Sequence, residues 1–173
     1  NIAGRQRMLS QKLVKEILLL KEVSAPIQKT EISTNLNKTF SLWIESHKNL
    51  LNGNSQLSLP IEKNLEILAM FDAMDPVFNT IKTAINDIII KSKTSDRDIS
   101  LEIQTVLENE PFFLNKMNAI VFAYDNISYE KIKTLKFLET FLLIVSLIIL
   151  GLEILFLFRP ISIRIRSVIK ELI

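Results

Sequence analysis

Hydrophobic side chains recur at helical spacing from the first residues of the chain. Between Ile2 and Ser24 the apolar positions are 7, 4, 4 and 3 residues apart, which places them on one face of a helix. These positions are Ile2, Leu9, Leu13, Ile17 and Leu20. The sequence Ser-Ala-Pro at 24–26 predicts the end of this helix or a kink in it.

Two further amphipathic helices are predicted next. The second runs from about Gln28 to Leu51 and stops at the Asn-Gly-Asn turn at 52–54. The third begins near Pro60, a suitable first-turn proline, and continues to about Lys93 with a kink expected at Pro76. The predicted inward positions are Ile32, Leu36, Phe40, Trp43 and Leu50 in the second helix, and Leu65, Leu68, Phe71, Val77, Ile81 and Ile85 in the third.

The fourth predicted helix joins the soluble part to an apolar segment. Ser95 or Asp96 is the expected N-cap, Pro111 marks an expected kink, and the helix then runs on without a turn signal. The chain has only three Gly and five Pro, which favours few and long elements. We therefore predict an all-α protein in which residues 1–134 form an antiparallel four-helix bundle that continues into a transmembrane helix.

Residues 140–158 read TFLLIVSLIILGLEILFLF, in which Glu153 is the single charge. At about 1.5 Å per residue this segment spans roughly 28 Å, close to the hydrocarbon thickness of a bilayer. We predict a membrane span over 135–158. Glu153 is expected either to reach the headgroups near the cytoplasmic end or to face another helix. In an antiparallel bundle the start of the first helix lies at the same end as this span, so a preceding span would fit before residue 1.

The charges that flank the span predict its orientation. Cations dominate after it, at Arg159, Arg164, Arg166 and Lys170 against Glu171, whereas the lysines before it, at 131, 133 and 136, lie between Glu130 and Glu139. Positive charge favours the cytoplasmic side. We therefore expect residues 1–134 to lie outside the cytoplasm, on the periplasmic or extracellular side of the membrane. Residues 159–173 would begin a cytoplasmic HAMP-like or coiled-coil linker.

Composition narrows the chemistry further. The chain has no Cys, which excludes disulfides and thiolate metal sites, and a net charge of +2 gives no electrostatic case for nucleic acid. His47 is the only histidine and is expected at the surface or in a groove. Asp72 and Asp75 are expected on a solvated helix face. Trp43, Phe112 and Phe113 are expected in the core, and we predict no catalytic residue, metal or cofactor.

The first twelve residues, NIAGRQRMLSQK, contain the strongest candidate site. Arg5, Arg7, Lys12 and Lys15 all precede the first acidic residue, Glu16. On a helix, Gly4, Arg7 and Gln11 share one face, and glycine there permits close approach of a second helix. A small planar oxyanion would neutralise a guanidinium in such a contact, because the two match in geometry. In a two-fold dimer, each chain would contribute one such arginine to a shared anion. The alternative is a set of cations that extend toward lipid headgroups.

The string AGRQRMLSQK, from Ala3, closely resembles the opening signature of the PilJ-type sensory domain of type IV pilus methyl-accepting chemotaxis transducers. Related domains occur in nitrate/nitrite sensor kinases. The string MNAIVFAYDNISYEKIKTLKFLE, from Met117, is similar to the last helix of that family, and LEILFLFRPI, from Leu152, is similar to its second span and linker. The resemblance covers nearly the whole chain.

The resemblance implies a dimeric four-helix sensor whose nitrate-sensing members hold nitrate or nitrite at the dimer axis through the arginine three residues after the glycine. That pattern maps onto Gly4 and Arg7. Asn1, Ala3 and Ser10 also match the motif, and we include Asn1 and Ser10 among the predicted ligand-binding residues. Lys12 stands where many members carry arginine. Two functions stay open: a receptor for a small oxyanion, and a ligand-free dimerisation and relay module that responds to a protein partner or to the state of the envelope.

Overall fold

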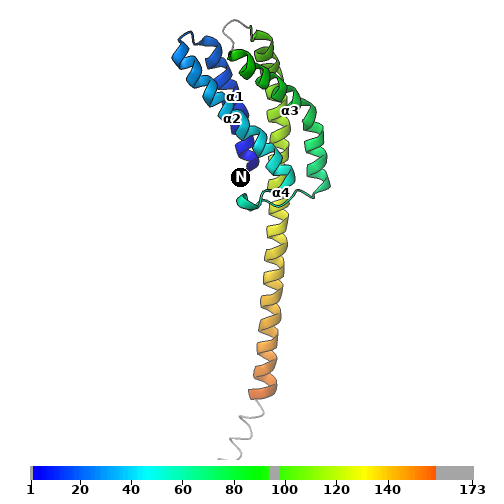
Figure 1. Ribbon diagram of the computed structural model, residues 1–173. Coiled ribbons are helices and arrows are strands. Elements are labelled where there is room, and N and C mark those ends of the chain that lie inside the picture. The colour runs from blue at the N-terminus through cyan, green and yellow to red at the C-terminus, as the bar shows by residue number, and fades with distance from the viewer. Residues whose placement is uncertain (1, 94–97, 159–173) are drawn as a thin grey trace, which may run out of the picture. The chain divides into compact units, whose positions relative to one another are not determined.

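The computed structural model describes residues 2–93 and 98–158. The chain divides into two compact units, Asn1–Asp125 and Asn126–Ile173. The first unit contains α1 (Ile2–Glu22), α2 (Pro26–Asn52), a short 3₁₀ turn η1 (Ser55–Leu57), α3 (Leu65–Ser92) and the beginning of α4 (Ser100–Glu153) (Figure 1). The predicted all-α class with four helices is confirmed.

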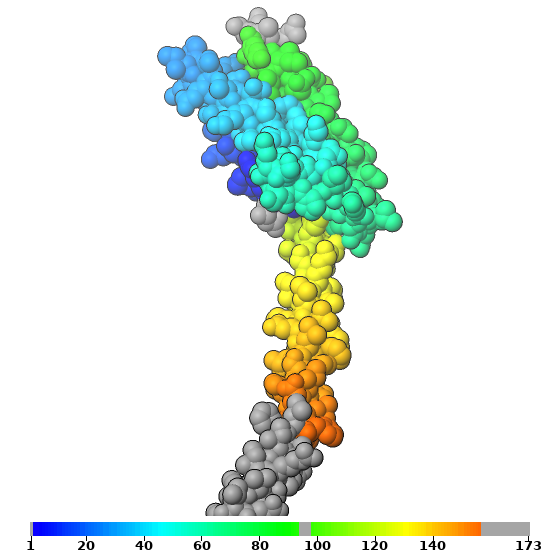
Figure 2. Space-filling model, turned by 60° about the horizontal axis from the view of Figure 1, so that its bottom comes forward, coloured from blue at the N-terminus to red at the C-terminus, as the bar shows by residue number. Residues whose placement is uncertain are grey.

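Aromatic side chains fill the centre of the first unit. Trp43 of α2 is fully buried, 4.3 Å from the ring of Phe78 on α3 and 5.2 Å from that of Phe113 on α4. Burial of aromatic rings from three helices supplies much of the apolar area that holds a bundle together. Along one face of this unit α2 and α3 lie packed against each other (Figure 2).

The predicted inward faces of α1 and α2 are largely confirmed. Eight of the ten predicted positions in these two helices are buried, and Ile2 and Ile32 are only partly buried. Trp43 and Phe113 lie in the core as expected, whereas Phe112 is 63% exposed, so its prediction was wrong. Adjacent residues on a helix differ by about 100° in direction, so one of two neighbouring phenylalanines must face away from a core on one side.

The predicted start and face of α3 need correction. The helix begins at Leu65 rather than near Pro60, because Asn64 accepts hydrogen bonds from the backbone N–H groups of Glu66 (2.9 Å) and Ile67 (3.3 Å) and so caps it. Leu65 is 81% exposed, and Leu68 and Val77 are half-buried. Phe71, Ile81 and Ile85 are buried as predicted, and the other buried positions are Ile67, Met74, Phe78, Ala84, Ile88 and Ile89.

Residues 53–64 form a compact connection between α2 and α3. Gly53 follows α2 with φ of +71° and ψ of 170°, a backbone conformation that essentially only glycine adopts. Asn54 then caps the η1 turn and exchanges backbone hydrogen bonds with Leu59.

The hydroxyl of Tyr124 on α4 donates to Glu62 Oε2 at 2.6 Å. Ile2 lines the same cleft as Tyr124, so the start of α1 and this part of α4 share one end of the unit.

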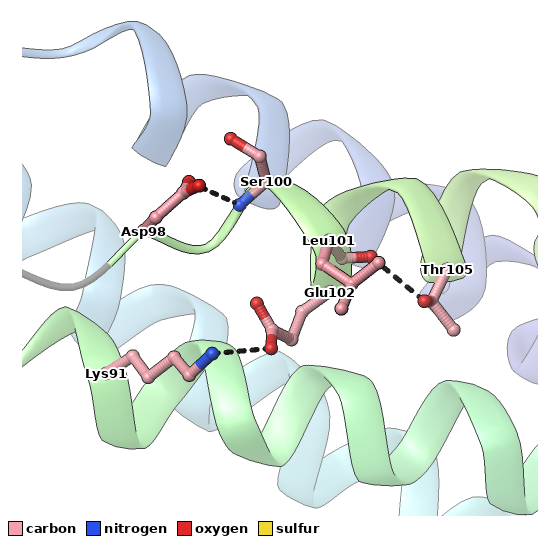
Figure 3. Close-up of polar contacts among 6 residues, drawn as sticks. All are labelled: Lys91, Asp98, Ser100, Leu101, Glu102 and Thr105. Atoms are coloured by element: carbon pink, nitrogen blue, oxygen red, sulfur yellow. Dashed lines mark hydrogen bonds and ion pairs between the residues drawn. The ribbon is translucent and has the colours of Figure 1, made fainter.

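At the opposite turn, Lys91 of α3 and Glu102 of α4 form an ion pair of 2.5 Å (Figure 3). Asp98 accepts from the backbone N–H of Ser100 at 2.9 Å. The pKa of the Asp98 carboxyl is lowered first by the side chain of Ser100 and then by this backbone bond. These contacts fix the start of α4. The predicted N-cap residues Ser95 and Asp96 lie outside the described residues.

Prolines 76 and 111 lie inside α3 and α4, and neither ends its helix. In the second unit α4 continues to Glu153 and ends in a π-helical turn, η2 (Ile154–Phe158). The described helix over Ser100–Phe156 contains an apolar window with a mean hydropathy of 2.4 and none of its residues buried. By length and composition it can cross a membrane, as the sequence predicted. The predicted linker, 159–173, lies outside the described residues.

Candidate functional site

A cleft of about 270 Å³ lies on the first unit between α1 and α4. Its lining comes from Gly4, Arg7, Met8 and Gln11 of α1 and from Leu114 and Asn118 of α4. The spacing argument is therefore correct for Gly4, Arg7 and Gln11, which share one helix face. Among the described residues that line this cleft, Arg7 is the only charged one.

Arg7 is half-buried, and its Nη1 donates a hydrogen bond to Oδ1 of Asn118 at 2.5 Å. A guanidinium has five N–H donors in a fixed plane, whereas an amide oxygen is a neutral acceptor. The contact therefore orients the Arg7 side chain without neutralising its charge. The cleft thus combines a positive charge held by a hydrogen bond with uncharged side chains.

Ser10 has a different environment from Arg7. It is buried, and its Oγ lies 2.8 Å from the backbone oxygen of Arg7 and 3.3 Å from Oε1 of Glu110 on α4. Burial raises the pKa of the Glu110 carboxyl, which favours its protonated form, although the bond to Ser10 acts in the opposite direction. These contacts join α1 to α4 one turn from Arg7, and Ser10 does not line the cleft. Asn1, also predicted as a ligand, lies outside the described residues.

Asn118 is the residue that sequence reasoning missed. It lies inside the string that begins at Met117, but nothing in that string marks it as a partner of a residue more than a hundred positions earlier. The only sequence signal for Asn118 was the helical spacing of the apolar residues around it. Met117 and Val121 are buried on α4, so the polar residue between them at 118 sits at the edge of the buried face.

The prediction for His47 was wrong. Its side chain is 8% exposed, and its ring stacks on Phe78 with centroids 3.8 Å apart and meets the edge of Phe71 at 5.6 Å. Its Nε2 lies 3.5 Å from Oδ1 of Asp75, so Asp75 has a partner inside the unit rather than facing only solvent. Asp72 is exposed as expected. Over residues 2–93 and 98–158 no cluster of His, Asp and Glu has the composition of a metal site.

Comparison with known proteins identifies the family of the chain and a solved structure with a similar fold. The family described as "Type IV pili methyl-accepting chemotaxis transducer N-term" matches residues 1–101. The chain belongs to the PilJ family. No curated protein shows a significant match to it. Among solved structures, the ligand-binding domain of the P. aeruginosa nitrate receptor McpN is similar, with 23% identity and a TM-score of 0.54. The match covers 74% of this chain and 94% of that one, and at this identity it shows a shared fold.

Proposed function

We propose that this PilJ chain is the sensor region of a bacterial transmembrane signalling receptor and binds a small oxyanion, nitrate or nitrite, through Arg7. In this proposal two chains form a homodimer, residues 1–134 lie on the periplasmic or extracellular side of the inner membrane, and residues 135–158 span it. The observation that carries the proposal is the Arg7 guanidinium, half-buried in a cleft with neutral neighbours. In this proposal the chain acts by binding, with no catalytic step.

The surface of α1 beside the cleft supports the dimer. Met8, Gln11, Lys15 and Leu18 are exposed and follow one another at spacings of 3 and 4 residues. This spacing is typical of a helix that packs against another helix. In a two-fold dimer the same face meets itself, which brings the two Arg7 side chains toward the axis. An anion between them relieves the repulsion of two like charges and so stabilises the dimer.

The Arg7–Asn118 hydrogen bond supplies a route for the signal. It joins α1 to α4, and α4 carries the apolar segment proposed to cross the membrane. An anion at Arg7 would accept hydrogen bonds from the same guanidinium that donates to Asn118. Binding therefore changes the relation of α1 to α4, which is the kind of helix displacement that transmembrane receptors use. The ligand has to bind the two arrangements with different affinities to bias them.

Isothermal titration calorimetry of the 173-residue chain in detergent micelles tests this function. Nitrate and nitrite are titrated against chloride and sulfate as control anions, and the association state is measured by light scattering in parallel. We expect saturable heat with nitrate or nitrite, and a larger dimer fraction when the anion is bound. If the chain dimerises equally with and without these anions and releases no binding heat, the ligand-free relay module replaces the oxyanion receptor.

A further inference from the structure

His47 lies in an enclosed aromatic site between α2 and α3. Its ring is nearly parallel to that of Phe78, with 12° between the planes, and it meets Phe71 at 75°. Both phenylalanines belong to α3 and are themselves at most 5% exposed. A ring held on two sides by apolar neighbours has little water to stabilise a positive charge. The packing in this part of the α2–α3 contact therefore favours a neutral imidazole.

The two ring nitrogens of His47 have unequal surroundings. Nε2 lies 3.5 Å from Asp75 Oδ1, while Nδ1 is buried with no hydrogen-bond partner among the described residues. A neutral imidazole needs only one N–H donor, and the Asp75 carboxylate can accept it. An imidazolium has two N–H donors. Proton binding would therefore leave a charged donor at Nδ1 that is buried and unpaired, which is a costly state.

Other charged groups near the ring do not offset that cost. Asp75 is 49% exposed, so solvent screens its attraction for a protonated ring, and Lys82, also on α3, repels such a ring. On α1 the buried Glu16 is bonded to Thr39, two turns before His47 on α2, and on α4 Glu110 is bonded to Ser10. Burial is the largest influence on His47 and lowers its pKa, although Asp75 acts in the opposite direction.

We propose that His47 is a proton-sensing site, whose protonation loosens the contact between α2 and α3 when the solution around the bundle becomes acidic. The site is separate from the Arg7 cleft, which lies between α1 and α4. It gives the sensor a second input, the proton, alongside the proposed oxyanion. Since acidification acts on the α2–α3 pair, this input does not depend on whether any anion binds at Arg7.

The direction of the pH effect follows from the lowered pKa. The unfolded chain binds a proton at His47 near the ordinary value of about 6.5, whereas the folded chain binds it only at lower pH. The stabilisation from the neutral, packed ring is thus complete above pH 6.5. It is lost as the pH falls from there through the folded-state pKa. Acidification destabilises the bundle through this residue, and alkaline solution does not.

The single histidine makes the test direct. The 173-residue chain, labelled with ¹³C at histidine and phenylalanine and held in detergent micelles, is titrated from pH 8 to pH 4 by NMR, so that the single imidazole of the sequence reports His47. We expect a midpoint clearly below 6.5, accompanied by shifts in the ring resonances of Phe71 and Phe78. A midpoint at or above 6.5 overturns the proposal, as does titration without any change at the two phenylalanines.

Two variants separate His47 from the carboxylates that also titrate in acid. Between pH 7.5 and pH 5 the melting temperature of the wild type should fall by about 3 °C or more beyond that of His47→Gln. An equal fall in both proteins overturns the proposal. Asp75→Asn keeps the ring and removes the carboxylate that favours its charge, so the NMR midpoint should move to lower pH. An unchanged midpoint contradicts the Asp75 contact, and this arm remains informative if His47→Gln does not fold.

Discussion

Arg7 near the start of α1 and Asn118 on α4 are joined by a hydrogen bond of 2.5 Å from the guanidinium to the amide oxygen. The bond connects the helix that carries the family signature to the helix that carries the candidate membrane span. Its acceptor is neutral, so Arg7 keeps its positive charge in the cleft. A carboxylate at this position would have satisfied the guanidinium and favoured a purely structural role for Arg7.

Replacement of Arg7 should abolish the response to nitrate and nitrite while the bundle stays folded, because Arg7 is half-buried at the rim and is not a core residue. Thermal melting with and without each anion measures this. Anion at about 100 times its dissociation constant should raise the apparent stability of the wild type by roughly 2.7 kcal/mol, and that of Arg7→Ala by nothing. Arg7→Lys should lose most of the gain, since an ammonium cannot present two parallel donors.

Arg5→Ala is the matched control for this experiment. It removes the same charge from the same helix, but Arg5 is exposed and does not line the cleft. Its melting temperature should rise with anion as the wild type does. Equal gains in Arg7→Ala and Arg5→Ala would show that the anion acts through general screening of positive charge, and the Arg7 site would be wrong.

Asn118 should matter for affinity through its effect on Arg7. Asn118→Leu removes the acceptor that holds the guanidinium and should weaken anion binding by calorimetry, at a stability cost of about 1.5–3 kcal/mol for a hydrogen bond to a charged group. Asn118→Asp should reduce binding further, because its carboxylate competes with the anion for Arg7. Asn115→Leu, at an exposed position one turn earlier on α4, should bind as the wild type does. Equal affinity in all three variants would contradict this role.

The neighbouring residues Phe112 and Phe113 should differ sharply in their contribution to stability. Phe113 is fully buried against Trp43, so Phe113→Ala should lower the free energy of unfolding by about 3–5 kcal/mol. Phe112 is 63% exposed, and Phe112→Ala should change stability by less than about 0.5 kcal/mol. Denaturant unfolding measures both. A similar loss from the two substitutions would mean that the α4 face is assigned incorrectly.

Gly53 should not tolerate a side chain. A Cβ atom there would lie 2.7 Å from the backbone nitrogen of Ile61 and 2.8 Å from the backbone oxygen of Leu59, and its φ of +71° is already unfavourable for other residues. We expect Gly53→Ala to destabilise the first unit by at least about 1–3 kcal/mol in denaturant unfolding. Gly151→Ala is the control, because nothing lies within 4 Å of a Cβ at that helical position. A harmless Gly53→Ala would contradict the geometry of the connection.

The proposed orientation can be tested because the chain has no cysteine of its own. A single cysteine at Gln56, an exposed residue of η1, should react with a membrane-impermeant thiol reagent on cells whose outer barrier is permeabilised. A single cysteine at Ser167 should react only after lysis, because the cations after the span favour the cytoplasm. Labelling at Ser167 but not at Gln56 on unlysed cells would reverse the topology.

Helix number, the approximate limits of α1 and α2, and the apolar segment were all predictable from the sequence. Each depends on residues close together in the chain: the spacing of Leu9, Leu13 and Ile17, the turn at Gly53, and the long apolar run with a single charge. The signature around Gly4 and Arg7 is equally local, because its residues follow one another within a few turns of one helix, and the family could therefore be predicted from the sequence alone.

Tertiary structure alone decided the partners. The sequence does not show that Asn118 holds Arg7, because that bond joins two helices distant in the chain and depends on how α1 and α4 pack. The burial of His47 could not be predicted from the sequence either, because its chain neighbours Ser46 and Lys48 are polar. The rings that bury it, Phe71 and Phe78, belong to another helix. Local spacing fixes which helices form, whereas packing between helices determines which polar side chains lose water and which partners they gain.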